Sequence, residues 1–94
     1  MAPAAKVVAS FSIDALRYVK SGANVGVTFE ASEGLAGSRT VVDILGMDGK
    51  VVSSRSATTL AGVNQLVLDA PKPGLYMLRV RAGSQMKAGR ILVK

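Results

Sequence analysis

The segment TVVDILGMDGKVVSS at residues 40–54 is the clearest indication of the fold. The same pattern of apolar runs continues in LAGVNQLVLDAPKPGLYMLRV at residues 60–80 and in MKAGRILVK at residues 86–94. Runs of aliphatic and β-branched residues are separated by Asp48-Gly49 and Pro73-Gly74, dipeptides that are typical of tight turns. β-Branched side chains fit a pleated, half-buried surface, so these runs indicate strands. The second half of the chain therefore predicts successive antiparallel strands.

Alternation of apolar and polar residues predicts which face of each strand is buried. The alternation is clean over residues 24–31 and 75–81, whereas residues 39–45 carry adjacent apolar pairs and are expected to be buried on both faces. The expected core consists of Phe29, Val42, Ile44, Leu66, Leu68, Tyr76, Leu78 and Val80. About seven short strands at a spacing of roughly 8–12 residues predict an all-β fold, an antiparallel immunoglobulin-like β-sandwich.

Several local features are also predicted. A first strand is expected at residues 7–13, and residues 14–19 form either a helical turn or a bulged continuation of it. Asp48 and Gly49 are expected to supply the positive φ angles of a tight hairpin. Tyr76, just after a turn, is interpreted as a tyrosine-corner or core residue. Asn64 is expected to hydrogen-bond locally at a turn or strand start.

Length and composition indicate the domain organisation. Ninety-four residues fit a single domain, expected to span residues 1–94. The chain has no cysteine, and no run of about 18 apolar residues predicts a transmembrane helix. Its first residues lack the pattern of a signal peptide, so for an exported parent that signal is expected upstream. If the parent is exported, the chain is then expected to be the excised C-terminal domain of a larger secreted protein.

The distribution of basic residues along the chain indicates a candidate recognition site. The formal net charge is +6, and most of the basic residues lie after residue 49, where Asp69 is the only acid. Such an excess of positive charge attracts anionic partners. The same charges can instead keep a solvated sheet edge from pairing with strands of other molecules. The candidate patch comprises Arg79, Arg81, Lys87, Arg90 and Lys94. If all five point to water, changing Arg79 and Arg81 to Glu is expected to abolish anion binding and alter stability by no more than roughly 1 kcal/mol.

Catalytic chemistry is not indicated. The chain has no histidine, which removes the usual general base and the commonest neutral metal ligand. Glu30 and Glu33 are interpreted as solvated acids rather than a catalytic pair, and Asp43 with Asp48 supplies too few oxygen ligands for an EF-hand. The chain is therefore expected not to be an enzyme and to have no cofactor or metal site.

The motifs of residues 41–94 resemble the C-terminal sorting domain of the type IX secretion system of Bacteroidetes. The resemblance rests on Gly49-Lys50, Gly62 with Asn64, Gly74 with Tyr76, and the basic last strand. The basic C-terminal domains of Fibrobacter secreted glycoside hydrolases are similar. The first forty residues match weakly, because Phe11-Ser12-Ile13 stands where the family has an Asn-Pro pair.

The resemblance implies a non-enzymatic domain that directs a secreted or cell-surface protein through the periplasm and across the outer membrane. Its partner would be the outer-membrane secretion machinery, with anionic polysaccharide or lipopolysaccharide as a further possible ligand. The alternative is an accessory carbohydrate-binding or fibronectin-like module of a polysaccharide-degrading enzyme. Nucleic acid is the least favoured partner, because the chain lacks aromatic stacking platforms.

Overall fold

The computed structural model describes residues 13–94 and forms an all-β fold there, as predicted. Its elements, in chain order, are β1 (Ile13–Ser21), β2 (Asn24–Ala31), the short 3₁₀ helix η1 (Glu33–Leu35), β3 (Arg39–Leu45), β4 (Val51–Thr58), β5 (Gly62–Asp69), β6 (Gly74–Ala82) and β7 (Gln85–Val93). The strand expected at residues 7–13 lies outside the described residues except for Ile13, which begins β1.

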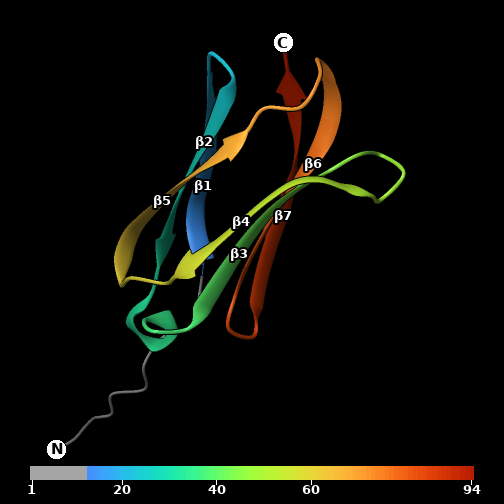
Figure 1. Cartoon of the computed structure of the whole chain (residues 1–94). Helices are drawn as coiled ribbons and strands as arrows, with labels where there is room; N and C mark the ends of the chain where they lie inside the picture. Colours follow the sequence, from blue (N-terminus) through green and yellow to red (C-terminus); the bar gives the residue numbers. More distant parts are fainter. Residues whose placement is uncertain (1–12) are drawn as a thin grey trace, which may run out of the picture.

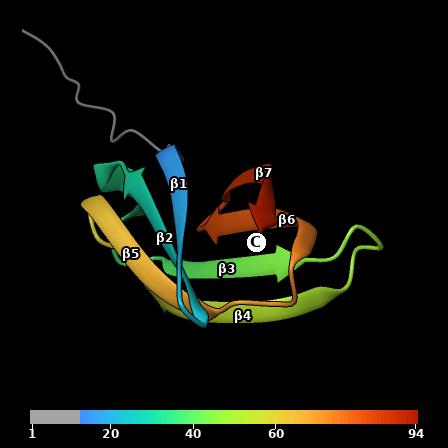
Figure 2. The ribbon, with the colours of Figure 1, turned by 90° about the horizontal axis from the view of Figure 1, so that it is seen from above.

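The strands form two antiparallel sheets (Figure 1). One has the order β1-β2-β5 and the other the order β4-β3-β6-β7; Figure 2 shows the three-stranded sheet running obliquely to the four-stranded one. The fourth strand thus extends a sheet made of the third, sixth and seventh, as in immunoglobulin-like sandwiches. The predicted fold class is confirmed.

The core lies between the two sheets. Seven of the eight predicted core side chains are buried, and Tyr76 is half-buried against the same cluster. The core also contains Ile13, Val25, Val27, Ala31, Leu35, Ala82, Ile91 and Val93. The expectation that β3 is buried on both faces is only partly correct, because Val41 and Leu45 on its outer face are half-buried.

Strand β1 resolves the choice left open for residues 14–19 in favour of a bulged strand. Its pairing with β2 shifts register between Asp14 and Arg17. Within the bulge Ala15 has a φ of 53°, a conformation uncommon for a residue other than glycine. After the bulge, Tyr18 lies opposite the buried Val27 and shares its face of the sheet, although Tyr18 itself is 38% exposed. Its hydroxyl accepts a hydrogen bond from the backbone N–H of Leu92 on β7, at 3.2 Å.

The turn between β3 and β4 differs from the expectation in its geometry. Only Gly49, with a φ of 89°, has a positive φ; Asp48 does not. The N–H of Gly49 donates to the carbonyl of Gly46 at 2.9 Å, and the N–H of Gly46 donates to the carbonyl of Lys50 at 2.8 Å. This arrangement is a turn followed by a glycine bulge rather than a two-residue loop with two positive φ angles.

Two predicted local contacts are present. The hydroxyl of Tyr76 donates to the carbonyl of Lys72 at 2.7 Å, four residues upstream, as in a tyrosine corner. The side chain of Asn64 is buried; its amide oxygen accepts from the N–H of Leu60, and its amide nitrogen donates to the carbonyls of Leu60 and Gly62. Asn64 therefore closes the connection that leads into β5.

Candidate anion-recognition face

The outer face of the four-stranded sheet carries the candidate recognition residues. Arg79 and Arg81 lie on β6, between inward-facing Leu78, Val80 and Ala82. On β7, Arg90 lies opposite Met77, and residues directly opposite one another share a face of a sheet. Arg79, Arg81 and Arg90 therefore lie on this same outer face.

Lys87 does not lie on the same face. It pairs with Val80, whose side chain is fully buried on the inward side, so Lys87 lies on the opposite face of β7 from Arg90. Its own side chain is exposed, unlike those of Ile91 and Val93 on the same face of β7. Lys94 follows the end of β7 and is also exposed. The predicted five-residue patch is thus divided between two faces of the hairpin.

A buried carboxylate lies beneath two of the arginines. Asp43 on β3 is only 3% exposed, although its side chain is on the outer face of the sheet. Its Oδ2 accepts from Arg79 Nη2 at 2.8 Å and from Arg81 Nη2 at 3.4 Å. Its Oδ1 accepts from the hydroxyl of Ser54 at 2.7 Å. Asp43 therefore fixes two neighbouring strands to β3 and neutralises one guanidinium charge.

The environment of Asp43 lowers its pKa from the ordinary value near 3.8. Burial alone raises the pKa, because it disfavours the charged form. Hydrogen bonds from Arg79 and Ser54, together with the positive charges of Arg79 and Arg81, outweigh that effect. Asp43 is consequently a carboxylate at neutral pH.

This arrangement revises the expectation for the double change of Arg79 and Arg81 to Glu. The Arg79 side chain is 30% exposed and the Arg81 side chain 49% exposed, so neither is a freely solvated charge. Two new carboxylates beside the buried Asp43 would repel it and remove its hydrogen bonds. The substitution is therefore expected to destabilise the domain, and it cannot separate binding from folding.

Arg39 is a member of this face that sequence reasoning missed. Arg39 precedes Val41 by two positions on β3, and Val41 lies opposite Arg81. Arg39 and Arg81 are thus diagonal neighbours on one face, at a distance of about 7–8 Å between Cα atoms. We define the basic face as Arg39, Arg79, Arg81 and Arg90. Strand alternation places Arg39 and Asp43 on one face, but only the β3–β6 register brings them beside Arg79 and Arg81.

Other chemistry is not assembled in the described part of the chain. Glu30 and Glu33 are both exposed, one on β2 and one in η1. Residues 13–94 contain no group of three or more His, Cys, Asp or Glu side chains arranged to hold a metal ion. No helix within the same residues has the length and apolar character needed to cross a membrane.

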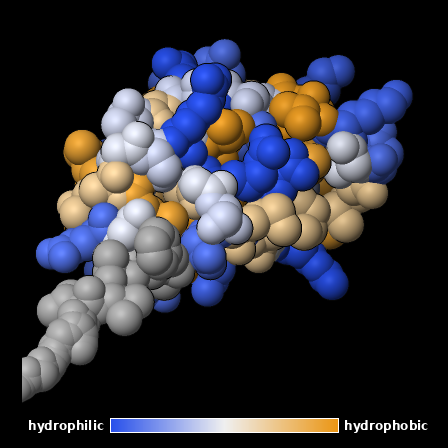
Figure 3. All heavy atoms as spheres, turned by 90° about the horizontal axis from the view of Figure 1, so that it is seen from below, coloured by the Kyte–Doolittle hydropathy of each residue, from blue (hydrophilic) through white to orange (hydrophobic). Residues whose placement is uncertain are grey.

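The surface seen from below is mixed in character. Figure 3 shows strongly hydrophilic side chains near the middle of this view, with hydrophobic ones directly beside them. The exposed apolar side chains of the described residues include Leu75, Met86 and Leu92, which share the outer face of the β6–β7 hairpin with the arginines. A partner of this face would therefore meet both guanidinium groups and apolar area.

Comparison with protein-family models, with curated proteins and with solved structures gives no match.

Proposed function

We propose that this domain is a non-enzymatic sorting module that directs a larger secreted protein across the outer membrane through a type IX secretion system. The observation that carries the proposal is the outer face of the C-terminal hairpin, where Arg79, Arg81 and Arg90 lie beside exposed apolar side chains. The motifs that resemble the sorting-domain family coincide with β3 to β7, which include the whole four-stranded sheet.

The chemistry of the face supports recognition by a protein surface that carries acidic groups. Arg90 forms no ion pair with a carboxylate of residues 13–94, so its charge is available to a partner. Leu75 and Leu92 lie directly opposite each other and are about half exposed. Guanidinium groups around apolar area are typical of protein interfaces, where arginine is enriched and lysine depleted. The receptor in this proposal is the outer-membrane secretion machinery, reached from the periplasm.

An accessory polysaccharide-binding module is the second candidate. The observation that favours it is a shallow hollow on the outer face of the three-stranded sheet, with a volume of about 310 Å³, where exposed Val19 and Val67 lie on either side of Gly26. The hollow is lined by no aromatic side chain, so stacking on a sugar ring is not available there.

A reporter fusion in a bacterium with a type IX system tests the sorting proposal. The reporter carries an N-terminal signal peptide and this domain at its C-terminus, and surface and periplasmic fractions are measured. We expect Arg90→Glu to reduce surface delivery at least about tenfold, because it reverses a charge at the centre of the proposed contact. Deleting residues 86–94 would be a poor test, since it removes Ile91 and Val93 from the core.

Lys87→Glu is the matched control, because it reverses one charge on the same strand but on the other face. It is expected to leave surface delivery within about twofold of the unmodified domain, since rim charges away from the contact contribute little. Equal surface delivery by the Arg90→Glu and Lys87→Glu variants would show that the basic face is not the surface recognised by the secretion machinery. Equal delivery with and without the folded domain would reject sorting and leave the accessory-module candidate.

A further inference from the structure

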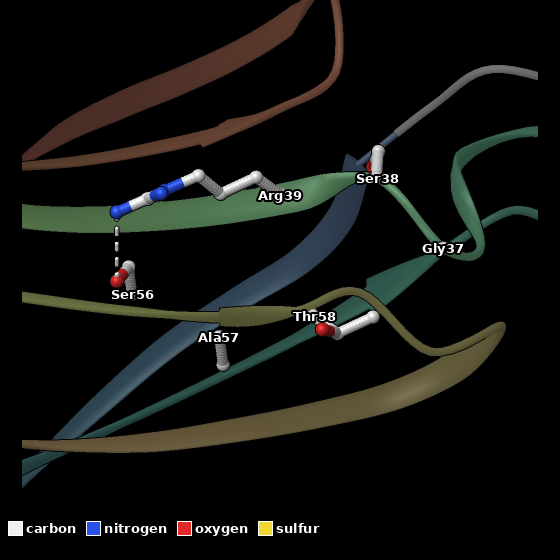
Figure 4. A pocket seen from close by; sticks show the side chains of 6 residues that line it. All are labelled: Gly37, Ser38, Arg39, Ser56, Ala57 and Thr58. Atoms are coloured by element: carbon white, nitrogen blue, oxygen red, sulfur yellow. Dashed lines mark hydrogen bonds between the residues drawn. The ribbon is translucent and has the colours of Figure 1, made fainter.

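A second hollow lies at the end of the basic face, where β3 begins and β4 ends. It has a volume of about 360 Å³ and is lined by Gly37, Ser38, Arg39, Ser56, Ala57 and Thr58 (Figure 4). Arg39 extends along β3, and its Nη2 donates to the hydroxyl of Ser56 at 3.3 Å. Thr58 lies opposite Arg39 in the register and shares its face. One guanidinium and two outward-facing hydroxyls therefore line this hollow, with the guanidinium beside Ser56.

The two walls of the hollow are held together by hydrogen bonds behind it. The N–H of Gly37 donates to the carbonyl of Thr59 at 2.9 Å, and the N–H of Thr59 donates to the carbonyl of Ser38 at 2.8 Å. The hydroxyl of Ser38 bonds the carbonyl of Leu35 and the hydroxyl of Thr59, and the buried hydroxyls of Thr59 and Thr40 bond each other. This network fixes the segment before β3 against the end of β4, so the hollow is formed before any ligand enters.

The electrostatics of the hollow favour an anion. Among residues 13–94 the ion pairs are those of Asp43 with Arg79 and Arg81, so Arg39 has no carboxylate partner there. No acidic residue lines the hollow, and Arg81 is a diagonal neighbour of Arg39 on the same face. Arg39 uses one N–H on Ser56, and the Ser56 hydroxyl, as the acceptor of that bond, keeps its own proton for a ligand.

These donors match a group with several acceptor oxygens. A sulfate or phosphate ester presents three oxygens, and a guanidinium binds such groups in a planar, two-pronged arrangement. The hollow is open and shallow, and none of its lining residues is aromatic, so it suits an ester on a flexible polar chain better than a stacked base. Hydroxyls of Ser56 and Thr58 can also bond the hydroxyls of the sugar that carries the ester.

We propose that Arg39, Ser56 and Thr58 form a binding site for the sulfate or phosphate ester of an anionic polysaccharide. The inference stands independently of the sorting proposal, because Arg39 lies two strands away from Arg90 and the hollow does not include β7. A single exposed site binds one ester weakly. A polysaccharide that carries many esters binds more tightly, because successive esters rebind at a high effective concentration.

The test is titration of the isotope-labelled chain followed by two-dimensional NMR, at constant sodium chloride. The probes are sodium sulfate, dextran sulfate, neutral dextran, and duplex DNA at matched charge concentration. Sulfate and dextran sulfate should shift the amide signals of residues 37–39 and 56–58, and neutral dextran should shift none. Arg39→Gln should weaken dextran sulfate binding about tenfold, the equivalent of one hydrogen bond to a charged group.

Arg55→Gln is the control, because Arg55 lies on the same strand as Ser56 but opposite the inward-facing Val42, on the other face of β4. It removes the same charge and should change dextran sulfate affinity less than twofold. Equal losses in the two variants would overturn the site, since they would indicate attraction to the overall charge. The site would also be overturned if the shifted amide signals lay outside residues 37–39 and 56–58, or if sulfate bound and dextran sulfate did not. DNA binding as tight as dextran sulfate binding, with the same dependence on Arg39, would overturn the assignment to a polysaccharide.

Discussion

Asp43 shows how a single residue couples the stability of the sheet to the chemistry of its surface. A buried charge costs free energy unless it is paired and hydrogen-bonded, and Asp43 meets both conditions through Arg79, Arg81 and Ser54. An acid between Val42 and Ile44 in an apolar strand is visible in the sequence. Its partners are not, because Arg79 lies 36 residues away and only the β3–β6 register brings the two together.

Replacing Asp43 with Asn should destabilise the domain by about 1–3 kcal/mol, because it leaves two neighbouring guanidinium groups without their carboxylate. The arginines are partly exposed, so solvent screening keeps the effect below that of a fully buried pair. Urea unfolding at pH 7 measures the change. Asp69→Asn, which removes an exposed acid from β5, is the control and should shift stability by less than about 0.5 kcal/mol.

The same pair of variants predicts a pH dependence. The folded-state pKa of Asp43 is lowered, so its contribution is fully present above its ordinary pKa near 3.8 and is lost as pH falls through the folded-state value. The unmodified domain should therefore lose more stability than the Asp43→Asn variant between about pH 5 and pH 2. Parallel pH profiles for the two proteins would show that the ion pair does not stabilise the folded state.

At the scale of strands, alternation predicted the buried faces well where a strand is regular. Both β2 and β5 have the predicted inward residues, and β6 carries Leu78 and Val80 inward with Arg79 and Arg81 outward. The bulge in β1 was not predictable to the residue, because it depends on the pairing with β2 that puts Ile13 and Tyr18 on one face although they are five positions apart. The alternation rule could also have excluded part of the predicted patch: Lys87 and Arg90 are three positions apart and cannot share a face of one regular strand.

Strand β6 offers a direct test of this inside-and-outside assignment. Leu78→Ala should cost roughly 2–5 kcal/mol, because Leu78 is buried and its removal leaves a cavity. That is a large part of the roughly 5–15 kcal/mol that stabilises a typical domain. Leu75→Ala makes the same chemical change on the outer face of the same strand, where the side chain is about half exposed, and should cost far less. Similar melting temperatures for the two variants would contradict the assigned faces.

Across the whole molecule, positively charged side chains outnumber negatively charged ones. The chain carries 12 Lys and Arg against 6 Asp and Glu, and the ion pairs formed within residues 13–94 all involve Asp43. A net charge of +6 on a small domain opposes compaction through self-repulsion. The excess of positive charge is visible in the sequence. Only the fold shows that Asp43 pairs with Arg79 and Arg81, and that Arg39 and Arg90 have no carboxylate partner among the described residues.

Sodium chloride should therefore stabilise this domain. Raising its concentration from about 10 to 150 mM shortens the Debye length from roughly 30 Å to 8 Å and screens the repulsion between distant cations, while the short bonds to buried Asp43 are screened less. A gain of about 0.5 kcal/mol corresponds to a rise in Tm of roughly 2–4 °C for a domain of this size. Chloride is used because sulfate strengthens burial generally and would also occupy the hollow beside Arg39.

Arg55→Gln, which lowers the net charge by one, should raise Tm at low salt and flatten the salt dependence. A fall in Tm with added sodium chloride would mean that attractive pairs, rather than the excess of positive charge, dominate the electrostatics of the folded state.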